Sequence, residues 1–255
     1  MADAPAPSGL LSARRVLSIL LAFSPERHTH SVRALAEVAG LPLPSAYRYL
    51  AMLRDLGLLL ESSPGRYRLS GRVFTLAEAA RAAEPLLEVA DPVMRRLAAR
   101  TGEAVVLVQL IGNVAVCTHR IESERLLRVS FPPGRALPLD RGASSRILLA
   151  SLPPPSREAL LVELCEGDPA RVAKLGEAVA LAGRRGWATG DQEIDEGIWV
   201  AAAALRGSSG ILGCLAVPSP SVRARPKERE ALLAQVRAAA QAIGQALELD
   251  RAPTP

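Results

Sequence analysis

The sequence predicts an α+β protein in two parts: a small helical head that ends in a basic hairpin, and a larger domain of mixed helices and strands. Three observations predict this organisation. Apolar residues recur at helical spacing between residues 11 and 56, interrupted at Pro25 and Gly40. A turn and a short alternating segment with two arginines, Arg66 and Arg68, follow. Beyond residue 85, apolar runs of strand length alternate with helical segments.

The length and composition predict a globular protein without a membrane span. The chain has 255 residues, 49% of them hydrophobic, which is enough to form the core of one large or two modest domains. Residues 1–9 are rich in Ala and Pro and lack the features of a signal peptide, so they are expected to be a disordered tail, as are residues 251–255. The sequence has no uncharged apolar run of about 18 residues, so no membrane span is expected.

The three cysteines are Cys117, Cys165 and Cys214, an odd number without paired spacing. This pattern argues against a disulfide framework and against a thiolate zinc site. His28 and His30 have no Cys or carboxylate partner at metal-site spacing, and we interpret them as loop residues. The sequence therefore predicts a reduced, cytoplasmic protein with no metal and no cofactor.

The positive charge is concentrated in the head. The net charge of the chain is +5, yet the first 72 residues hold nine arginines against five carboxylates, a balance of +4. The remaining 183 residues are nearly neutral. A basic head on a neutral body predicts a surface that binds a polyanion, although an arginine-rich surface that only keeps the protein soluble would look the same.

The head is expected to contain three helices. The first covers residues 11–23, with Ser12 as its N-cap, and the second begins at the N-cap Ser31 and stops at Gly40. The third starts at Pro44 and runs to Leu56. Its inward stripe is formed by Ala46, Tyr49, Leu50, Leu53 and Leu56.

Two short helices joined by a tight turn are typical of a helix-turn-helix, and the hairpin at residues 58–69 turns this motif into a winged helix-turn-helix over residues 10–72. The DNA major groove, about 12 Å wide, admits one helix, while hairpin cations can contact phosphates. We expect Arg48 to contact bases or phosphate, Ser45 to hold a phosphate, and Tyr47 to stack on sugar or bond a phosphate. The predicted contacts are completed by Arg33, Arg66 and Arg68. Each arginine has the alternative of a solvated surface residue, and Tyr47 that of a half-buried edge of the core.

The rest of the chain is expected to form a linker helix and one further domain. The linker helix covers residues 73–84, and the domain covers 85–250. Gly112-Asn113 is a favoured hairpin turn and joins two predicted strands at 104–111 and 114–119. Further strands are expected at 198–205 and 211–217, and helices at 86–100 with a kink or restart at Pro92, 144–152, 156–165, 170–186 and 226–249. This order suits one sheet with helices packed on it and a pocket on its concave side.

Several of these segments, in this order, resemble the IclR family of bacterial transcriptional regulators over roughly residues 10–250. In the head, the resemblance rests on Ser31-Val32-Arg33-Ala34-Leu35-Ala36, Gly40-Leu41-Pro42 and the Gly65–Leu69 wing. In the larger domain it rests on Thr101-Gly102-Glu103, His119-Arg120-Ile121-Glu122, Pro138-Leu139, the run from Gly142 to Ala150, Gly186-Trp187-Ala188, Asp191, Glu193 and Gly197.

The resemblance implies a sequence-specific DNA-binding regulator that forms a homodimer or tetramer on an operator in double-stranded DNA. It also implies a GAF-like α/β domain that binds a small organic effector. The positions that hold the effector in this family correspond to Gly142, Ala143, Asp191, Val200 and Ala216. The family often has Cys in place of Val200 and hydroxyl residues in place of Ala216 and Pro218, so a more apolar pocket is expected here.

Among the few polar residues left near these positions, Asp191 and either Ser144 or Ser145 are candidate effector contacts. Their alternatives are a helix cap for Ser144 and a turn acid for Asp191. The sequence does not indicate which effector is bound, which operon is controlled, or whether the protein represses or activates.

Two other classes of protein are alternatives to a regulator. An enzyme could use Ser144, His119 and Asp191 as a triad, or Cys117 or Cys214 as a nucleophile. However, the chain has no Gly-x-Ser-x-Gly elbow, no phosphate-binding glycine loop and no metal motif, so no enzyme is predicted. An architectural DNA-binding protein without an effector is the second alternative, and the large apolar second domain argues against it.

Overall fold

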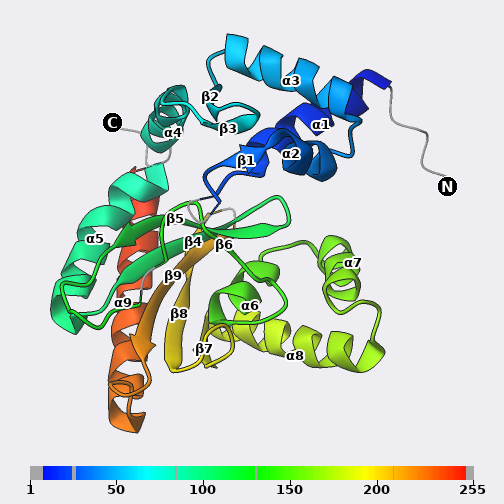
Figure 1. The fold of residues 1–255 in the computed structure, drawn as a ribbon. Coiled ribbons are helices and arrows are strands. Elements are labelled where there is room, and N and C mark those ends of the chain that lie inside the picture. The colour runs from blue at the N-terminus through cyan, green and yellow to red at the C-terminus, as the bar shows by residue number, and fades with distance from the viewer. Residues whose placement is uncertain (1–7, 25–26, 84, 130, 209, 251–255) are drawn as a thin grey trace. The chain divides into compact units, whose positions relative to one another are not determined.

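The computed structural model describes residues 8–24, 27–83, 85–129, 131–208 and 210–250. The chain divides into two compact units, Met1–Ala83 and Glu84–Pro255, which are described separately (Figure 1). The predicted tails, residues 1–9 and 251–255, lie outside the described residues except for Ser8 and Gly9, which are helical. The Pro25 break also lies outside them.

In the first unit, the described residues form four helices and a small sheet. These are α1 (Ser8–Leu21), α2 (Val32–Val38), α3 (Leu43–Asp55) and α4 (Arg72–Ala82). The antiparallel sheet has the order β1-β3-β2, formed by β1 (His30–Ser31), β3 (Arg66–Leu69) and β2 (Leu59–Ser63). Its core is formed by one apolar stripe from each of α1, α2 and α3 together with strand residues, including Ile19, Leu35, Leu50, Leu53, Leu59 and Tyr67.

Local signals at the helix ends account for most of this unit. The hydroxyl of Ser31 accepts a hydrogen bond from the Ala34 N–H at 3.2 Å, which confirms the predicted cap of α2. The prediction that Ser12 caps the first helix is wrong, because α1 already begins at Ser8. Leu56 was expected to face inward but is 52% exposed, since the helical path ends at Asp55.

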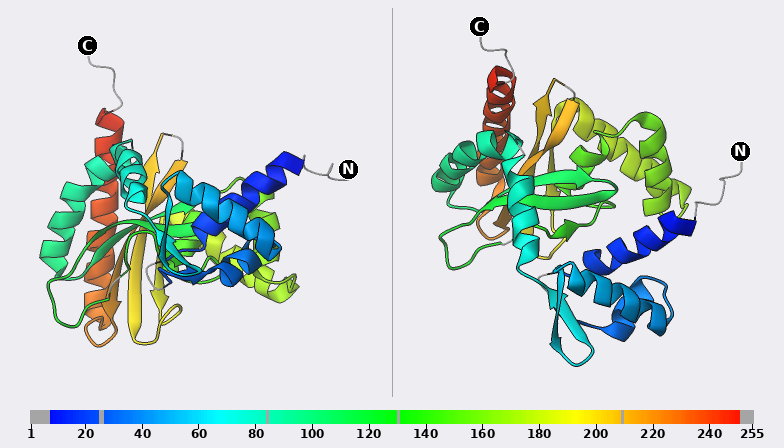
Figure 2. Two further views of the ribbon diagram at one scale, coloured as in Figure 1. Left: turned by 45° about the horizontal axis from the view of Figure 1, so that its top comes forward. Right: turned by 90° about the horizontal axis from the view of Figure 1, so that it is seen from above.

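The second unit is one six-stranded antiparallel sheet covered by helices on both faces (Figures 1 and 2). Its strand order is β6-β5-β4-β9-β8-β7. The strands are β4 (Val105–Ile111), β5 (Val114–Ile121), β6 (Ala136–Leu137), β7 (Trp187–Asp191), β8 (Ile198–Gly207) and β9 (Gly210–Pro220). The helices are α5 (Pro85–Thr101), α6 (Ala143–Leu149), α7 (Pro154–Leu164), α8 (Pro169–Arg185) and α9 (Pro226–Asp250).

Each face of this sheet has its own apolar layer. Side chains alternate along β8, so that Ala201 and Ala203 lie in one layer and Ala202 and Ala204 in the other. We call the face under α5 and α9 the α9 face, where Met94, Trp199, Leu215, Val236 and Ile243 are buried. We call the opposite face the α6 face, where Val108, Cys117, Ile147, Leu148 and Val179 are buried.

The fold decides between the two alternatives left open at Pro92 and adds two strands to those predicted. The helix around Pro92 is a single element, α5, with the proline inside it rather than a restart. The sequence did not predict the short strand β6 or the edge strand β7. The structure has no helix, within the residues it describes, that is long and apolar enough to cross a membrane.

Candidate functional site

Helix α3 presents a polar face to solvent at its N-terminal half. Ala46 and Leu50 are fully buried in the core of the first unit, which fixes the orientation of the helix. Tyr47 is 53% exposed, Arg48 is also exposed, and Ser45 is half-buried. The N-terminal half of α3 is therefore accessible, with an aromatic and a cationic side chain next to each other on it.

The β2–β3 hairpin presents two arginines outward. Tyr67 is only 5% exposed, and its neighbours Arg66 and Arg68 point to the opposite, exposed side of β3, as the alternation predicted. The Glu61 carboxylate accepts a hydrogen bond from the Gly65 N–H at 2.8 Å and so closes the turn. Burial, and next the nearby charge of Glu61, raise the pKa of the Tyr67 hydroxyl.

Within the described residues, the cations of this surface have no acidic partner. Arg33, Arg48, Arg66 and Arg68 are all exposed, and none of them forms an ion pair with the residues that the structure describes. By contrast, Arg54 at the end of α3 lies 3.6 Å from the Glu61 carboxylate. Exposed guanidinium groups without an acidic partner, close to an accessible helix, are suited to contact the phosphate backbone of DNA.

In the second unit, five of the six predicted effector residues lie on the α6 face, contributed by α6 and the residue before it and by strands β8 and β9. Gly142 directly precedes the helix, and the Ala143 nitrogen would lie 3.4 Å from a Cβ placed on Gly190, the partner of Val200 in the β7–β8 ladder. Ala216 belongs to the same apolar layer. Ser144 is 7% exposed and its side chain hydrogen bonds to Cys214 of β9.

Asp191 does not join this group. It pairs with Trp199 across the β7–β8 ladder, and Trp199 is buried in the layer of the α9 face. The Asp191 carboxylate accepts a hydrogen bond from Arg229 of α9 at 2.8 Å, and that guanidinium lies 5.5 Å from the centre of the Trp199 ring. The structure thus places Asp191 on the other face of the sheet from Ala143, Val200 and Ala216.

The carboxylate that does reach α6 belongs to Glu193, which was not predicted as a contact. It accepts hydrogen bonds from the Gly142 N–H at 2.9 Å and from both terminal nitrogens of Arg146 at 2.7 and 3.0 Å. Arg146 also donates to the Thr189 carbonyl at 2.6 Å. Gly142 has a φ of +97°, a conformation that favours glycine, and a Cβ there would also lie 2.9 Å from the end of the Ile194 side chain.

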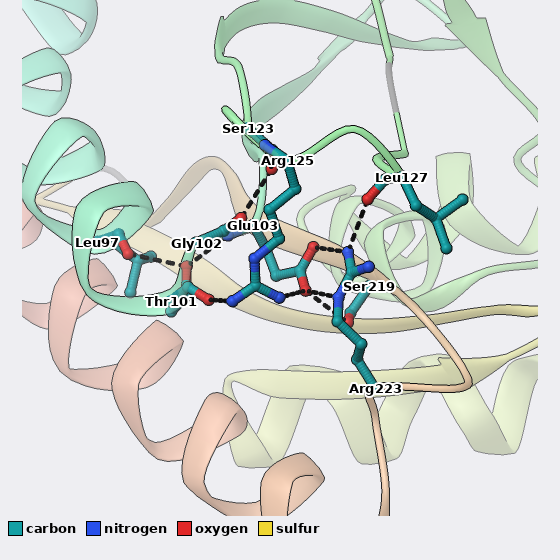
Figure 3. A network of polar contacts seen from close by, with 9 residues as sticks. All are labelled: Leu97, Thr101, Gly102, Glu103, Ser123, Arg125, Leu127, Ser219 and Arg223. Carbon is teal, nitrogen blue, oxygen red and sulfur yellow. Dashed lines mark hydrogen bonds and ion pairs between the residues drawn. The ribbon is translucent and has the colours of Figure 1, made fainter.

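A second polar network lies at the end of the sheet around Glu103, whose side chain is 5% exposed (Figure 3). Its two carboxylate oxygens accept hydrogen bonds from Arg223 at 2.7 Å each, and one of them also accepts from Arg125 at 3.1 Å and Ser219 at 3.2 Å. Arg223 in turn donates to the Leu127 carbonyl. One buried charge thus connects three segments that are far apart in the sequence.

The side chains weighed for catalysis do not assemble. His119 bonds to Asp91 at 2.8 Å, whereas Ser144 and Asp191 have the other partners given above. Burial raises the pKa of the Cys117 thiol to about 11 and that of Cys214 to about 12, so neither is a ready nucleophile. The described part of the chain contains no cluster of three His, Cys, Asp or Glu residues suited to a metal ion.

Two family models match the chain and together cover both units. The helix-turn-helix domain of the IclR family matches residues 12–62. The model for the bacterial transcriptional regulator IclR C-terminal domain matches residues 79–245.

Curated relatives support the same family. The transcriptional regulator TtgV of Pseudomonas putida is 33% identical over 156 residues, which is 61% of this chain and 60% of TtgV. KipR of Bacillus subtilis is 30% identical over 50% of this chain, which spans about half of KipR, 51%. KdgR of Dickeya chrysanthemi is 26% identical over 93% of this chain and 80% of its own length.

Solved structures share the fold. The IclR-family regulator from Brucella abortus has a TM-score of 0.78 at 22% identity, covering 92% of both chains. An IclR homologue from Microbacterium hydrocarbonoxydans, solved with 4-hydroxybenzoate, has a TM-score of 0.76 at 24% identity, covering 92% of this chain and 98% of the homologue. With both family models matched in order, the chain belongs to the IclR family of bacterial transcriptional regulators.

Proposed function

We propose that this regulator binds a specific operator through α3 and the β2–β3 wing, and that a small organic effector in the second unit changes its operator affinity. The observation that carries the DNA-binding part is the accessible N-terminal half of α3 together with four exposed arginines, on α2, α3 and the wing, that have no ion-pair partner in the described residues. As a dimer, the protein would place two α3 helices in successive major grooves, about 34 Å apart. A DNA-bound regulator of this kind acts in the bacterial cytoplasm.

The proposed DNA contacts are of two kinds, first to bases in the major groove and second to the DNA backbone. Arg48, on the exposed face of α3, is proposed to enter the major groove. Contacts to phosphate or sugar are proposed for the other residues: Ser45 and Tyr47 on α3, Arg33 on α2, and Arg66 and Arg68 on the wing. Only the first kind can carry sequence information.

Replacing Arg66 with alanine is expected to weaken binding to all DNA sequences alike. Arg66 is exposed and points away from the core, so its loss removes one phosphate contact without disturbing the fold. The slope of log affinity against log salt should fall by about one counterion. Titration of specific and random duplexes at several salt concentrations measures this. A defect confined to one sequence would contradict the wing assignment.

The effector is proposed to bind on the α6 face, between α6 and strands β8 and β9. Ala143, Ser144, Val200 and Ala216 come together there, and Ser144 supplies a hydroxyl in an otherwise apolar surrounding. Glu193 holds the loop after β7 against α6 through Arg146, so entry of an effector requires this contact to open. Opening would then be the step that communicates occupancy to the rest of the dimer. We propose a coupling of about 1–3 kcal/mol, which is usual for such switches.

Small aromatic acids are the proposed effector class, because the surrounding is apolar with a few polar groups at its edge. The homologue from Microbacterium hydrocarbonoxydans was solved with 4-hydroxybenzoate, which belongs to this class.

Thermal unfolding of the full chain with a panel of aromatic and aliphatic acids tests the proposal. A ligand present at 100 times its Kd is expected to stabilise the protein by about 2.7 kcal/mol. Ser144→Ala should weaken that ligand, whereas Asp191→Asn, on the other face, should leave its affinity unchanged. The proposed site would be contradicted if no acid of the panel stabilised the protein, or if Ser144→Ala and Asp191→Asn lost ligand affinity equally.

A further inference from the structure

A cavity of about 610 Å³ lies on the α9 face of the sheet, away from the proposed effector site. One wall is α9, which runs along that face in Figures 1 and 2, and the other is the end of β8 together with the junction of α8 and β7. The volume falls within the range of small-molecule sites, about 300–1,000 Å³. Nothing in the proposed effector mechanism uses this groove.

Three arginines from three different elements line the groove: Arg185 of α8, Arg206 of β8 and Arg237 of α9. None of them forms an ion pair within the described residues. Among the described residues that line the groove, Glu248 supplies the one carboxylate. With three guanidinium groups and one carboxylate among these lining residues, the groove carries an excess of positive charge.

The guanidinium groups are held in position before any ligand binds. Arg185 and Arg237 lie 5.1 and 5.8 Å from the centre of the Trp187 ring. Arg206 donates a hydrogen bond to the Gly183 carbonyl at 2.9 Å and so satisfies the last turn of α8. This hydrogen bond uses one nitrogen of Arg206, and neither Arg185 nor Arg237 takes part in it. Their remaining donors are available to a ligand.

The rest of the lining fits the same chemistry. Gln241 and Gln245 follow Arg237 at intervals of four residues, so all three lie on one side of α9 and line the groove. Small residues leave space between the walls. At Gly244 a Cβ would come within 2.8 Å of the Arg206 carbonyl oxygen, so glycine allows α9 to approach the end of β8 closely.

We propose that this groove binds a small polyanion that carries two or more carboxylate or phosphate groups. Planar guanidinium groups bond such oxygens in pairs, and preset cations lose little entropy on binding. The amides of Gln241 and Gln245 would hydrogen bond to the remaining oxygens or to a polar part of the ligand. The site is thus independent of the α6 face and would give the regulator a second small-molecule input.

The test uses the full chain with citrate and pyrophosphate as probes, titrated at constant ionic strength against a chloride control. Calorimetry gives the Kd, and fluorescence of Trp187 in a Trp199→Phe background reports where the ligand binds. We expect saturable binding of at least one probe with a change in Trp187 emission. Which probe binds more tightly distinguishes a carboxylate ligand from a phosphate ligand.

Arg237→Gln and Arg185→Gln are each expected to raise the Kd about tenfold, the effect of losing one charge-assisted contact. Arg184→Gln is the matched control, since it removes the same charge from the neighbouring exposed residue, which does not line the groove. Equal weakening by Arg184→Gln would show non-specific charge attraction and overturn the proposal. Absence of saturable binding by either probe would overturn it too, as would a Trp187 signal that follows protein concentration instead of probe.

Discussion

Arg48→Ala is expected to reduce operator affinity by about 1–3 kcal/mol, or roughly 5- to 150-fold, if the side chain contacts a base edge. Arg48 is exposed on the first half of α3, while Ala46 and Leu50 anchor the helix in the core. The substitution therefore removes a contact to DNA and leaves the fold intact. A gel-shift titration of specific and random duplexes measures the loss.

The conservative variant Arg48→Lys distinguishes the two roles that Arg48 could have. A lysine keeps the charge and so keeps most of a phosphate contact, but it lacks the planar pair of donors that recognises guanine. We expect Lys to restore binding to random DNA and not to the operator. Operator binding by Arg48→Ala that equals wild type would remove Arg48 from the interface.

Glu103→Gln is expected to destabilise the second unit by about 2–4 kcal/mol. Removing one member of a buried ion pair costs about 3–5 kcal/mol, and the partial exposure of Arg125 and Arg223 reduces that cost. The substitution leaves two guanidinium groups facing a neutral amide. It also weakens the contacts that hold Ser219 and the Leu127 segment to the end of the sheet.

Urea unfolding followed by tryptophan fluorescence measures this effect, since both tryptophans, Trp187 and Trp199, belong to the second unit. Glu124→Gln is the control, because Glu124 lies in the adjacent segment but is exposed. An unfolding midpoint for Glu103→Gln that matches wild type and Glu124→Gln would show that the network contributes little to stability.

The head could be predicted well from the sequence because its signals are local. A serine before a helix, a glycine after it and an alternating pair of arginines act over a few residues, and they predicted the Ser31 cap, the exposed face of α3 and the wing. The hairpin between β4 and β5 followed from Gly112-Asn113 for the same reason.

The second unit was harder because its site depends on strand register. The strand β7 was not predicted, so nothing assigned Gly190 and Asp191 to opposite faces of the sheet. The contact between Glu193 and Arg146 joins residues far apart in the chain, and so does that between Glu103 and Arg223. Periodicity within one segment carries no information about such pairs, and a resemblance identifies residues without showing which face they occupy.

The most direct test of the DNA-binding account is selection of genomic fragments by the purified wild-type chain and by Arg48→Ala in parallel. The account predicts that the wild-type chain enriches a small number of promoter fragments, each protected over two half-sites about 34 Å apart, and that Arg48→Ala loses this enrichment. Failure of the wild-type chain to enrich any fragment, or equal enrichment by the variant, would contradict recognition through α3.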